Sequence, residues 1–169
     1  HRQNPLNVFG PPGTTNFINS TLKTFEEDIK VRSLPPENLN IDNLKSNIEI
    51  IFDGYTYMKN GLTIETFAVK HEPYTYAFGF KIFNSKHCLV ISGDTTYSKQ
   101  VIEKSKNCDL LIHEIAHASE HTLNKYPKAK GVISYHSDVS QVSEIINTVK
   151  PRLTILNHVC LLYTSDAAD

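Results

Sequence analysis

The sequence has few cysteines, almost no net charge and no long apolar run, and each of these limits what the protein can be. Its three cysteines form no Cys-x-x-Cys pair, so neither a disulfide framework nor a zinc knuckle is indicated. No stretch approaches the roughly 18 apolar residues of a membrane span, so no membrane partner is expected. The net charge of −1 gives no overall attraction to nucleic acid, although a local basic patch stays compatible with it.

The length and both ends of the chain bear on its domain organisation. A chain of 169 residues that is 40% hydrophobic fits one globular domain or a large piece of one. It begins at His1 without a methionine, and residues 160–169 match the peptide encoded by a transposon adapter used for sequencing libraries. An ordinary final strand and turn is the alternative for that segment. We expect an internal fragment, with a partial domain over residues 1–159 and a non-native tail over residues 160–169.

Apolar periodicity predicts a run of strands followed by alternating strands and helices. Strands are predicted at residues 6–9, 48–52, 62–69, 76–82, 87–91, 109–112 and 153–156. Helices are predicted over residues 17–25, capped by Thr15 or Asn16, after a cap at Ser98, and after Ser137 and Asp138. The segments 76–82 and 87–91 should pair as a hairpin. This order predicts a mixed α/β layered fold.

Three of the predicted strands end in side chains that can bind metals or transfer protons. One strand runs into Gly93-Asp94-Thr95, another ends in His113-Glu114, and the last ends in His158. The run Tyr135-His136-Ser137 lies between the second and the third. Each polar residue alone could simply close its strand. Together they predict a site along one sheet edge, where α/β sheets usually bind ligands.

The order of these motifs resembles the C-terminal half of a metallo-β-lactamase-fold hydrolase, in particular the ribonuclease Z-like group. Segments 9–14, 69–72 and 77–80 also match that group, so the resemblance spans roughly residues 6–158. It implies the second half of a four-layer αβ/βα sandwich, whose sheet would be left exposed on one face. It also implies a hydrolase with two divalent metal ions, usually zinc.

The resemblance implies phosphodiester cleavage, as in processing the 3′ end of precursor transfer RNA, by a hydroxide formed at the metals. Other small-molecule esters, lactones or sulfate esters are alternative substrates, and a homodimer is common among such proteins. Residues 26–45 carry no basic stripe of the kind that grips phosphate backbones. The expectation of an RNA substrate therefore depends on the resemblance alone.

Asp94 and His158 are the metal ligands that the resemblance assigns. Asp94 would bridge the two metals, since a carboxylate at a strand end has one oxygen for each cation. His158 would bind the second metal, because a neutral imidazole at a strand end is a good zinc ligand. The alternatives are a turn-closing carboxylate and a core histidine bonded to the backbone.

His136 and Glu114 form the catalytic pair that the resemblance implies. His136 would protonate the leaving oxygen and Glu114 would orient it, since a carboxylate on one ring nitrogen fixes the tautomer and raises the basicity of the other. A surface histidine and a solvated charge are the alternatives. Three further residues are expected to line the substrate pocket or to support this pair from behind: His71, Thr95 and His113.

The chain lacks part of the family's metal-binding residues, and two other interpretations besides the hydrolase therefore have to be considered. The family's upstream motif, His-x-His-x-Asp-His, is absent. Two ligands cannot hold a catalytic zinc, which needs about three, so the chain by itself is expected to be inactive. A non-catalytic binding protein with a degenerate metal centre is therefore one alternative. A zincin is another, because His113-Glu-Ile-Ala-His117 fits His-Glu-x-x-His, but that motif needs a helix where this sequence predicts a strand, with His117 and His121 in loops.

Overall fold

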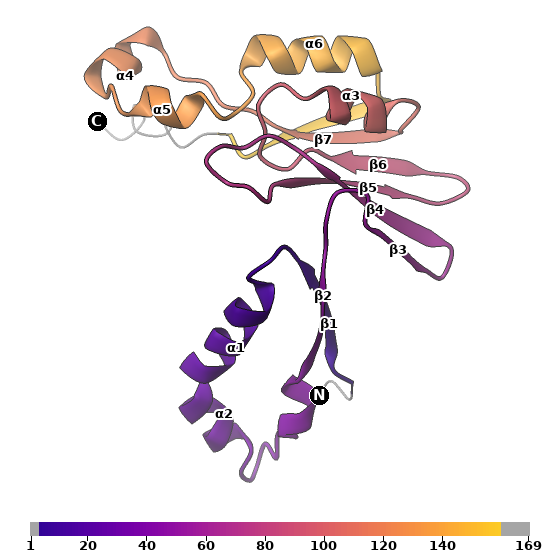
Figure 1. Cartoon of the computed structure of the whole chain (residues 1–169), viewed down its shortest axis with the longest axis vertical. Coiled ribbons are helices and arrows are strands. Elements are labelled where there is room, and N and C mark those ends of the chain that lie inside the picture. Colours follow the sequence, from indigo (N-terminus) through magenta and orange to yellow (C-terminus); the bar gives the residue numbers. More distant parts are fainter. Residues whose placement is uncertain (1–3, 160–169) are drawn as a thin grey trace. The chain divides into compact units, whose positions relative to one another are not determined.

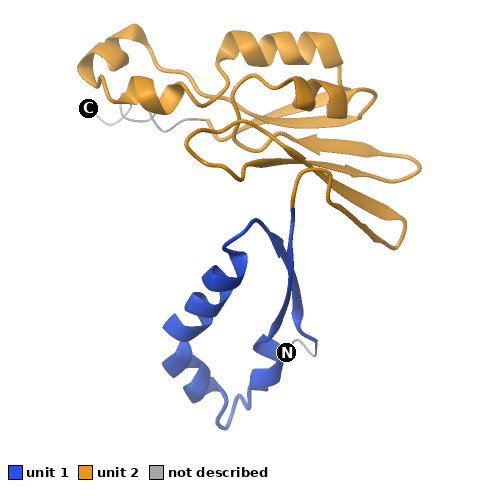
Figure 2. Ribbon diagram, viewed as in Figure 1, with its two compact units in different colours: residues 1–51 blue, residues 52–169 orange. Residues whose placement is uncertain are grey.

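The computed structural model describes residues 4–159. The chain divides into two compact units, residues 1–51 and 52–169 (Figure 2). The predicted boundary between a partial domain over residues 1–159 and a tail over residues 160–169 stays a prediction. The expected non-native tail, residues 160–169, lies outside the described residues. Within the described part, no helix combines the length and the apolar character needed to cross a bilayer.

The first unit is a pair of parallel strands joined by helices. Strand β1 (Leu6–Gly10) pairs with β2 (Ser46–Ile50). Between them lie α1 (Thr14–Thr24), α2 (Glu26–Arg32) and the 3₁₀ turn η1 (Ile41–Leu44). The predicted helix in residues 17–25 is confirmed, but its cap is Gly13 in the left-handed conformation (φ 99°) instead of Thr15 or Asn16. Helix α2 was missed, since its sequence is polar.

The second unit is a six-stranded sheet with the order β3-β4-β5-β6-β7-β8 (Figure 1). The strands are β3 (Thr56–Lys59), β4 (Leu62–Ala68), β5 (Phe78–Phe83), β6 (Cys88–Ile91), β7 (Leu110–Glu114) and β8 (Leu153–Asn157). Pairing is antiparallel from β3 to β6 and parallel from β6 to β8. The expected mixed α/β class and the β5–β6 hairpin are confirmed. Strand β3 was not predicted.

Helices cover one face of this sheet. Helix α3 (Lys99–Ser105) and α6 (Val139–Val149) lie on the same side of β6 and β7, and the short helices α4 (Glu120–Lys125) and α5 (Ala129–Ile133) precede α6 (Figure 1). The buried core between sheet and helices includes Phe67, Val90, Leu111, Val101 and Ile145. Because side chains alternate along a strand, Val90 and Leu111 fix which residues face the helices.

The other face of the sheet is apolar as well. A row in register across five strands consists of Ile64, Ile82, Leu89, Leu110 and Leu153. This face is open at the β8 edge, where 57% of Leu153 and 44% of Ile155 are exposed. An apolar face of this kind is what the sequence led us to expect.

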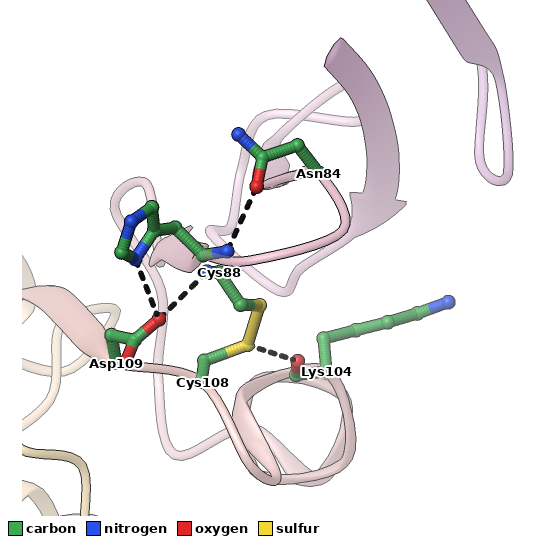
Figure 3. The surroundings of a disulfide bond; sticks show 6 residues. Asn84, Cys88, Lys104, Cys108 and Asp109 are labelled. Atoms are coloured by element: carbon green, nitrogen blue, oxygen red, sulfur yellow. Dashed lines mark hydrogen bonds and ion pairs between the residues drawn. A yellow bond between two sulfur atoms is a disulfide. The ribbon is translucent and has the colours of Figure 1, made fainter. Parts of the chain in front are cut away.

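The structure corrects the expectation about the cysteines, because Cys88 and Cys108 form a disulfide (Figure 3). Parallel pairing of β6 and β7 places Leu89 opposite Leu110, which brings the two Cα atoms to 4.6 Å. The carboxylate of Asp109 accepts a hydrogen bond from the Cys88 N–H beside the bridge. The cysteines are 20 residues apart and share no motif, so only the strand register reveals the pair.

Helix α6 begins with a capping box centred on Asp138. Its carboxylate accepts from the Gln141 N–H at 2.9 Å, and the Gln141 side-chain oxygen accepts from the Asp138 N–H at 3.0 Å. The predicted cap is therefore Asp138, while Ser137 instead donates its hydroxyl proton to Thr95 O. The helix buries Val142 and Ile145, so its start is tied to the core.

We expect Asp138→Ala to lower the free energy of unfolding by about 1 kcal/mol, because the Gln141 N–H and the Ser140 hydroxyl lose the carboxylate that accepts their hydrogen bonds. Urea denaturation measures the change. Ser143→Ala, at an exposed position of the same helix, is the matched control and should have little effect. Equal midpoints for the two variants would contradict a stabilising cap.

Candidate functional site

The predicted polar residues gather at one edge of the six-stranded sheet. Strands β6, β7 and β8 run parallel, so their carboxyl ends meet at this edge. Asp94 follows β6 after a turn at Gly93, whose φ of 63° and close approach to the Phe78 carbonyl leave no room for a side chain. Glu114 ends β7, and His158 follows β8 directly. The strand order thus brings together residues that are far apart in the sequence.

Glu114 connects three segments of the site through hydrogen bonds. Its side chain is fully buried, and Oε1 accepts hydrogen bonds from the Thr95 N–H at 3.1 Å and the Ser137 N–H at 2.9 Å. Oε2 has no hydrogen-bond partner among residues 4–159. Burial raises the pKa of Glu114 to about 7, although the two N–H groups act in the opposite direction.

His136 lies against this carboxylate. Its Nδ1 is 3.3 Å from Glu114 Oε1, within ion-pair distance, but the angles do not make a hydrogen bond, and within the described chain Nδ1 has no other partner. Burial, followed by the nearby His71, lowers the pKa of His136. The ring contacts two other imidazoles, with centroid distances of 4.9 Å to His71 and 5.2 Å to His158.

Asp94 and His158 lie at a distance that two ligands of one metal ion could have. Asp94 Oδ2 lies 3.6 Å from His158 Nε2, and both side chains are partly exposed. Two ligands of a tetrahedral zinc at about 2.0–2.1 Å would be separated by roughly 3.4 Å. Ligand atoms of Glu114, His136 and His158 also lie within 4.8 Å of one another. The donors present, carboxylate oxygen and imidazole nitrogen, therefore fit a divalent ion.

The three residues expected in the substrate pocket or behind the catalytic pair lie in different parts of the site. Thr95 is fully buried and holds Glu114 through its N–H. His71 also joins the site, since its Nδ1 lies 3.0 Å from Tyr135 O and its ring contacts that of His136. His113 is on the helix-covered side by strand alternation, and its Nδ1 lies 2.6 Å from Glu114 O.

Sequence reasoning did not single out two residues of the site. Ser137 supplies a backbone N–H to Glu114, and the ring of Tyr135 lies 5.2 Å from that of His136. Both flank the predicted His136, so their proximity in sequence was the available signal. A backbone donor leaves no trace in residue type, which explains why the role of Ser137 was overlooked.

The zincin alternative is wrong for this chain. His113 lies in strand β7, and His117 follows in a segment without helix before α4 begins at Glu120. The two histidines therefore do not share a helix face. His121 lies in α4 instead of the expected loop, and it is exposed.

Comparison with known proteins gives the family. The model of the family described as "Beta-lactamase superfamily domain" matches residues 1–159. The chain belongs to the β-lactamase superfamily.

Members of this superfamily and their solved structures cover nearly all of the chain. Ribonuclease Z of Mycobacterium tuberculosis (strain H37Rv) is 27% identical over 156 residues, which are 91% of this chain and 56% of that protein. The crystal structure of the short form of human tRNase Z has a TM-score of 0.62 at 17% identity, with 93% and 61% of the two chains covered. The metallo-β-lactamase fold protein YhfI from Bacillus subtilis has a TM-score of 0.59 at 16% identity, with 92% and 53% covered. The chain thus spans little more than half the length of these proteins.

In this superfamily domain, Glu114→Ala should lower the free energy of unfolding by about 1–3 kcal/mol, because the N–H groups of Thr95 and Ser137 would lose their buried acceptor. Glu114→Gln should recover most of the loss, since its amide oxygen can accept both bonds. Urea denaturation gives the values, with Glu103→Ala at an exposed position of α3 as control. If Glu114→Ala were as stable as the control, the three segments would not depend on this carboxylate.

Proposed function

We propose that this domain is part of a metal-dependent hydrolase that cleaves phosphodiester bonds in RNA, like ribonuclease Z. The observation that carries the proposal is the placement of a metal-ligand pair, Asp94 and His158, beside a buried acid/base pair, His136 and Glu114. The names of the relatives, ribonuclease Z and tRNase Z, support RNA as the substrate. The metallo-β-lactamase fold of the neighbours supports divalent metal use.

Asp94 and His158 would contribute to a centre of two divalent ions, and zinc suits their oxygen and nitrogen donors. Such ions, when bound, lower the pKa of water and stabilise the negative charge that develops on a phosphate. A catalytic zinc takes about three protein ligands. The remaining ligands therefore have to come from residues outside this pair.

The chain's own residues account for the departure of the leaving group. In the hydrolysis, a bond forms between the oxygen of water and phosphorus, and the bond from phosphorus to the leaving alcohol oxygen breaks. His136 donates a proton to that oxygen, so the alcohol leaves neutral, and the proton that the attacking water releases restores the one His136 has given up. Glu114 Oε1 lies 3.3 Å from Nδ1 of this ring without a hydrogen bond, and the N–H groups of Thr95 and Ser137 hold Glu114 in place. A hydrogen bond from Nδ1–H to Glu114, formed when the substrate is bound, would fix the orientation and the tautomer of His136.

The proposal is tested on the product of the complete source gene, stripped of metal and then reloaded with Zn²⁺ or Mn²⁺. Bis(p-nitrophenyl) phosphate reports phosphodiesterase activity, and a precursor transfer RNA reports RNA cleavage. We expect both substrates to be hydrolysed only after the metal is reloaded. A chelator should stop the hydrolysis. If the protein hydrolysed only lactones or only sulfate esters, that class of ester would replace RNA as the proposed substrate. Metal binding without hydrolysis of any ester would indicate a binding protein and contradict the proposal.

A further inference from the structure

A pocket adjoins the site on the side of His71 and Tyr135. It has a volume of about 280 Å³ and lies wholly within the second unit. Its lining comes from three segments that each run into the site, and the residues are Lys70, Glu72, Pro73, Thr96, Ser134 and Tyr135. Binding pockets for drug-sized ligands measure roughly 300–1,000 Å³, so this one lies near the lower end of that range and has room for one nucleoside-sized group.

A chain of contacts places this pocket relative to the metal-ligand pair. Asp94 is next to His158, and the His158 ring stacks on that of His136. His136 also contacts the rings of His71 and Tyr135. His71 lies between two pocket residues in sequence, and Tyr135 lines the pocket itself. His136 therefore separates the metal-ligand pair from the pocket.

This order has a consequence for the substrate. A general acid must come within hydrogen-bond reach of the oxygen that it protonates. If the phosphate lies beside Asp94 and His158, the alcohol that departs with this oxygen extends past His136, in the direction of the pocket. The lining residues include Tyr135, which has an aromatic ring, and Thr96 and Ser134. The two hydroxyls donate to Lys70 O and Gly131 O and can still accept a hydrogen bond from a nucleoside.

We propose that the pocket binds the leaving-group nucleoside of an RNA phosphodiester, with its base stacked on Tyr135 and its next phosphate on Lys70. The inference rests on the proposed function. Tyr135 is held from behind by His71, whose ring meets it edge-on at 5.0 Å and whose Nδ1 lies 3.0 Å from Tyr135 O. A stacking surface held in this way loses little freedom when a base binds.

Lys70 is placed to recognise a phosphate without being committed to one partner. Its ammonium group pairs with Glu72 at 3.2 Å, and both side chains are more than two-thirds exposed. An exposed pair of this kind is held weakly. A phosphate can therefore replace the Glu72 carboxylate, which leaves Glu72 near the sugar hydroxyls.

Binding to the ¹⁵N-labelled chain tests the pocket without any reaction. The probes are adenosine 5′-monophosphate, which carries a free 3′ hydroxyl, and adenosine, which lacks the phosphate. We expect both to shift the amide signals of Thr96 and Tyr135. Tyr135→Leu should weaken both about tenfold, the size of a lost base–aromatic stack. Lys70→Gln should weaken the monophosphate alone.

Matched controls are Tyr126→Leu and Lys59→Gln, at exposed positions away from the pocket lining. They should leave both affinities unchanged. The inference is overturned if Tyr135→Leu binds the two probes as tightly as Tyr126→Leu does, or if the shifted amides lie outside the pocket. Folding of each variant is checked by its unperturbed amide spectrum elsewhere in the sheet.

Kinetics on the metal-loaded product of the complete gene separate this inference from the proposed function. Two diesters are compared, one with a nucleoside and one with methanol as the leaving alcohol. Tyr135→Leu should raise KM about tenfold for the nucleoside and leave KM for the methyl ester unchanged. An equal change for both esters would contradict the subsite. If the wild-type protein cleaved neither diester, the proposed function would be contradicted. The nucleotide-binding experiment would still show whether the pocket binds a nucleoside.

Discussion

Replacing His136 with alanine is expected to leave the metal content unchanged and to lower turnover by about 10²–10⁴-fold, the usual contribution of a positioned proton donor. The loss should be larger for a substrate with an alkyl alcohol as leaving group than for one with p-nitrophenol, because only the poor leaving group needs the proton. Turnover of both substrates is measured on the metal-loaded product of the complete gene. His121→Ala, at an exposed position in α4, is the control.

Two results would speak against this role. Unchanged turnover in His136→Ala would remove the proton donor from the mechanism. Loss of metal in the same variant would make His136 a ligand, which its distance from Glu114 and His158 allows. Measuring metal content and turnover on the same preparation separates these outcomes.

Asp94→Ala is expected to remove metal and activity together. In the proposed centre its carboxylate would contribute oxygen ligands to the ions, so its removal should release them. Elemental analysis after dialysis measures the metal, and phosphodiester hydrolysis measures the activity. Asp42→Ala, an exposed carboxylate in the first unit, should match the wild type.

The outcome that contradicts a bridging Asp94 is full metal content with no activity. That result would leave Asp94 near the reaction but would assign the ligands to other residues. His158→Ala then becomes informative, because Asp94 Oδ2 and His158 Nε2 lie close enough to share one ion. Partial metal loss in His158→Ala with Asp94 intact would fit a residue that binds one ion of two.

The sequence predicted the site because its residues directly follow strands. Asp94, Glu114 and His158 each stand at the end of an apolar run, and parallel pairing of β6, β7 and β8 brings such ends together. His136 was identified from the resemblance of the run Tyr135-His136-Ser137 to the family, and its role as the acid stays a prediction. The mixed α/β fold followed from the same pattern of apolar runs.

The features that the sequence did not reveal depend on register and on which side of a strand faces the helices. The Cys88–Cys108 disulfide exists because Leu89 aligns with Leu110, and no local motif encodes that alignment. His113 was expected either to line the substrate pocket or to support the catalytic pair from behind, and only the alternation along β7 shows that it lies on the side of Leu111. The homodimer that the resemblance implies stays a prediction.

The measurement that tests the central claim most directly is anomalous scattering at the zinc edge from crystals of the zinc-loaded product of the complete gene. We expect a peak within about 2.0–2.2 Å of both Asp94 and His158. We also expect His136 to be free of the metal, with its Nδ1 toward Glu114. A peak bound by Glu114 and His136, or no peak near Asp94, would contradict it.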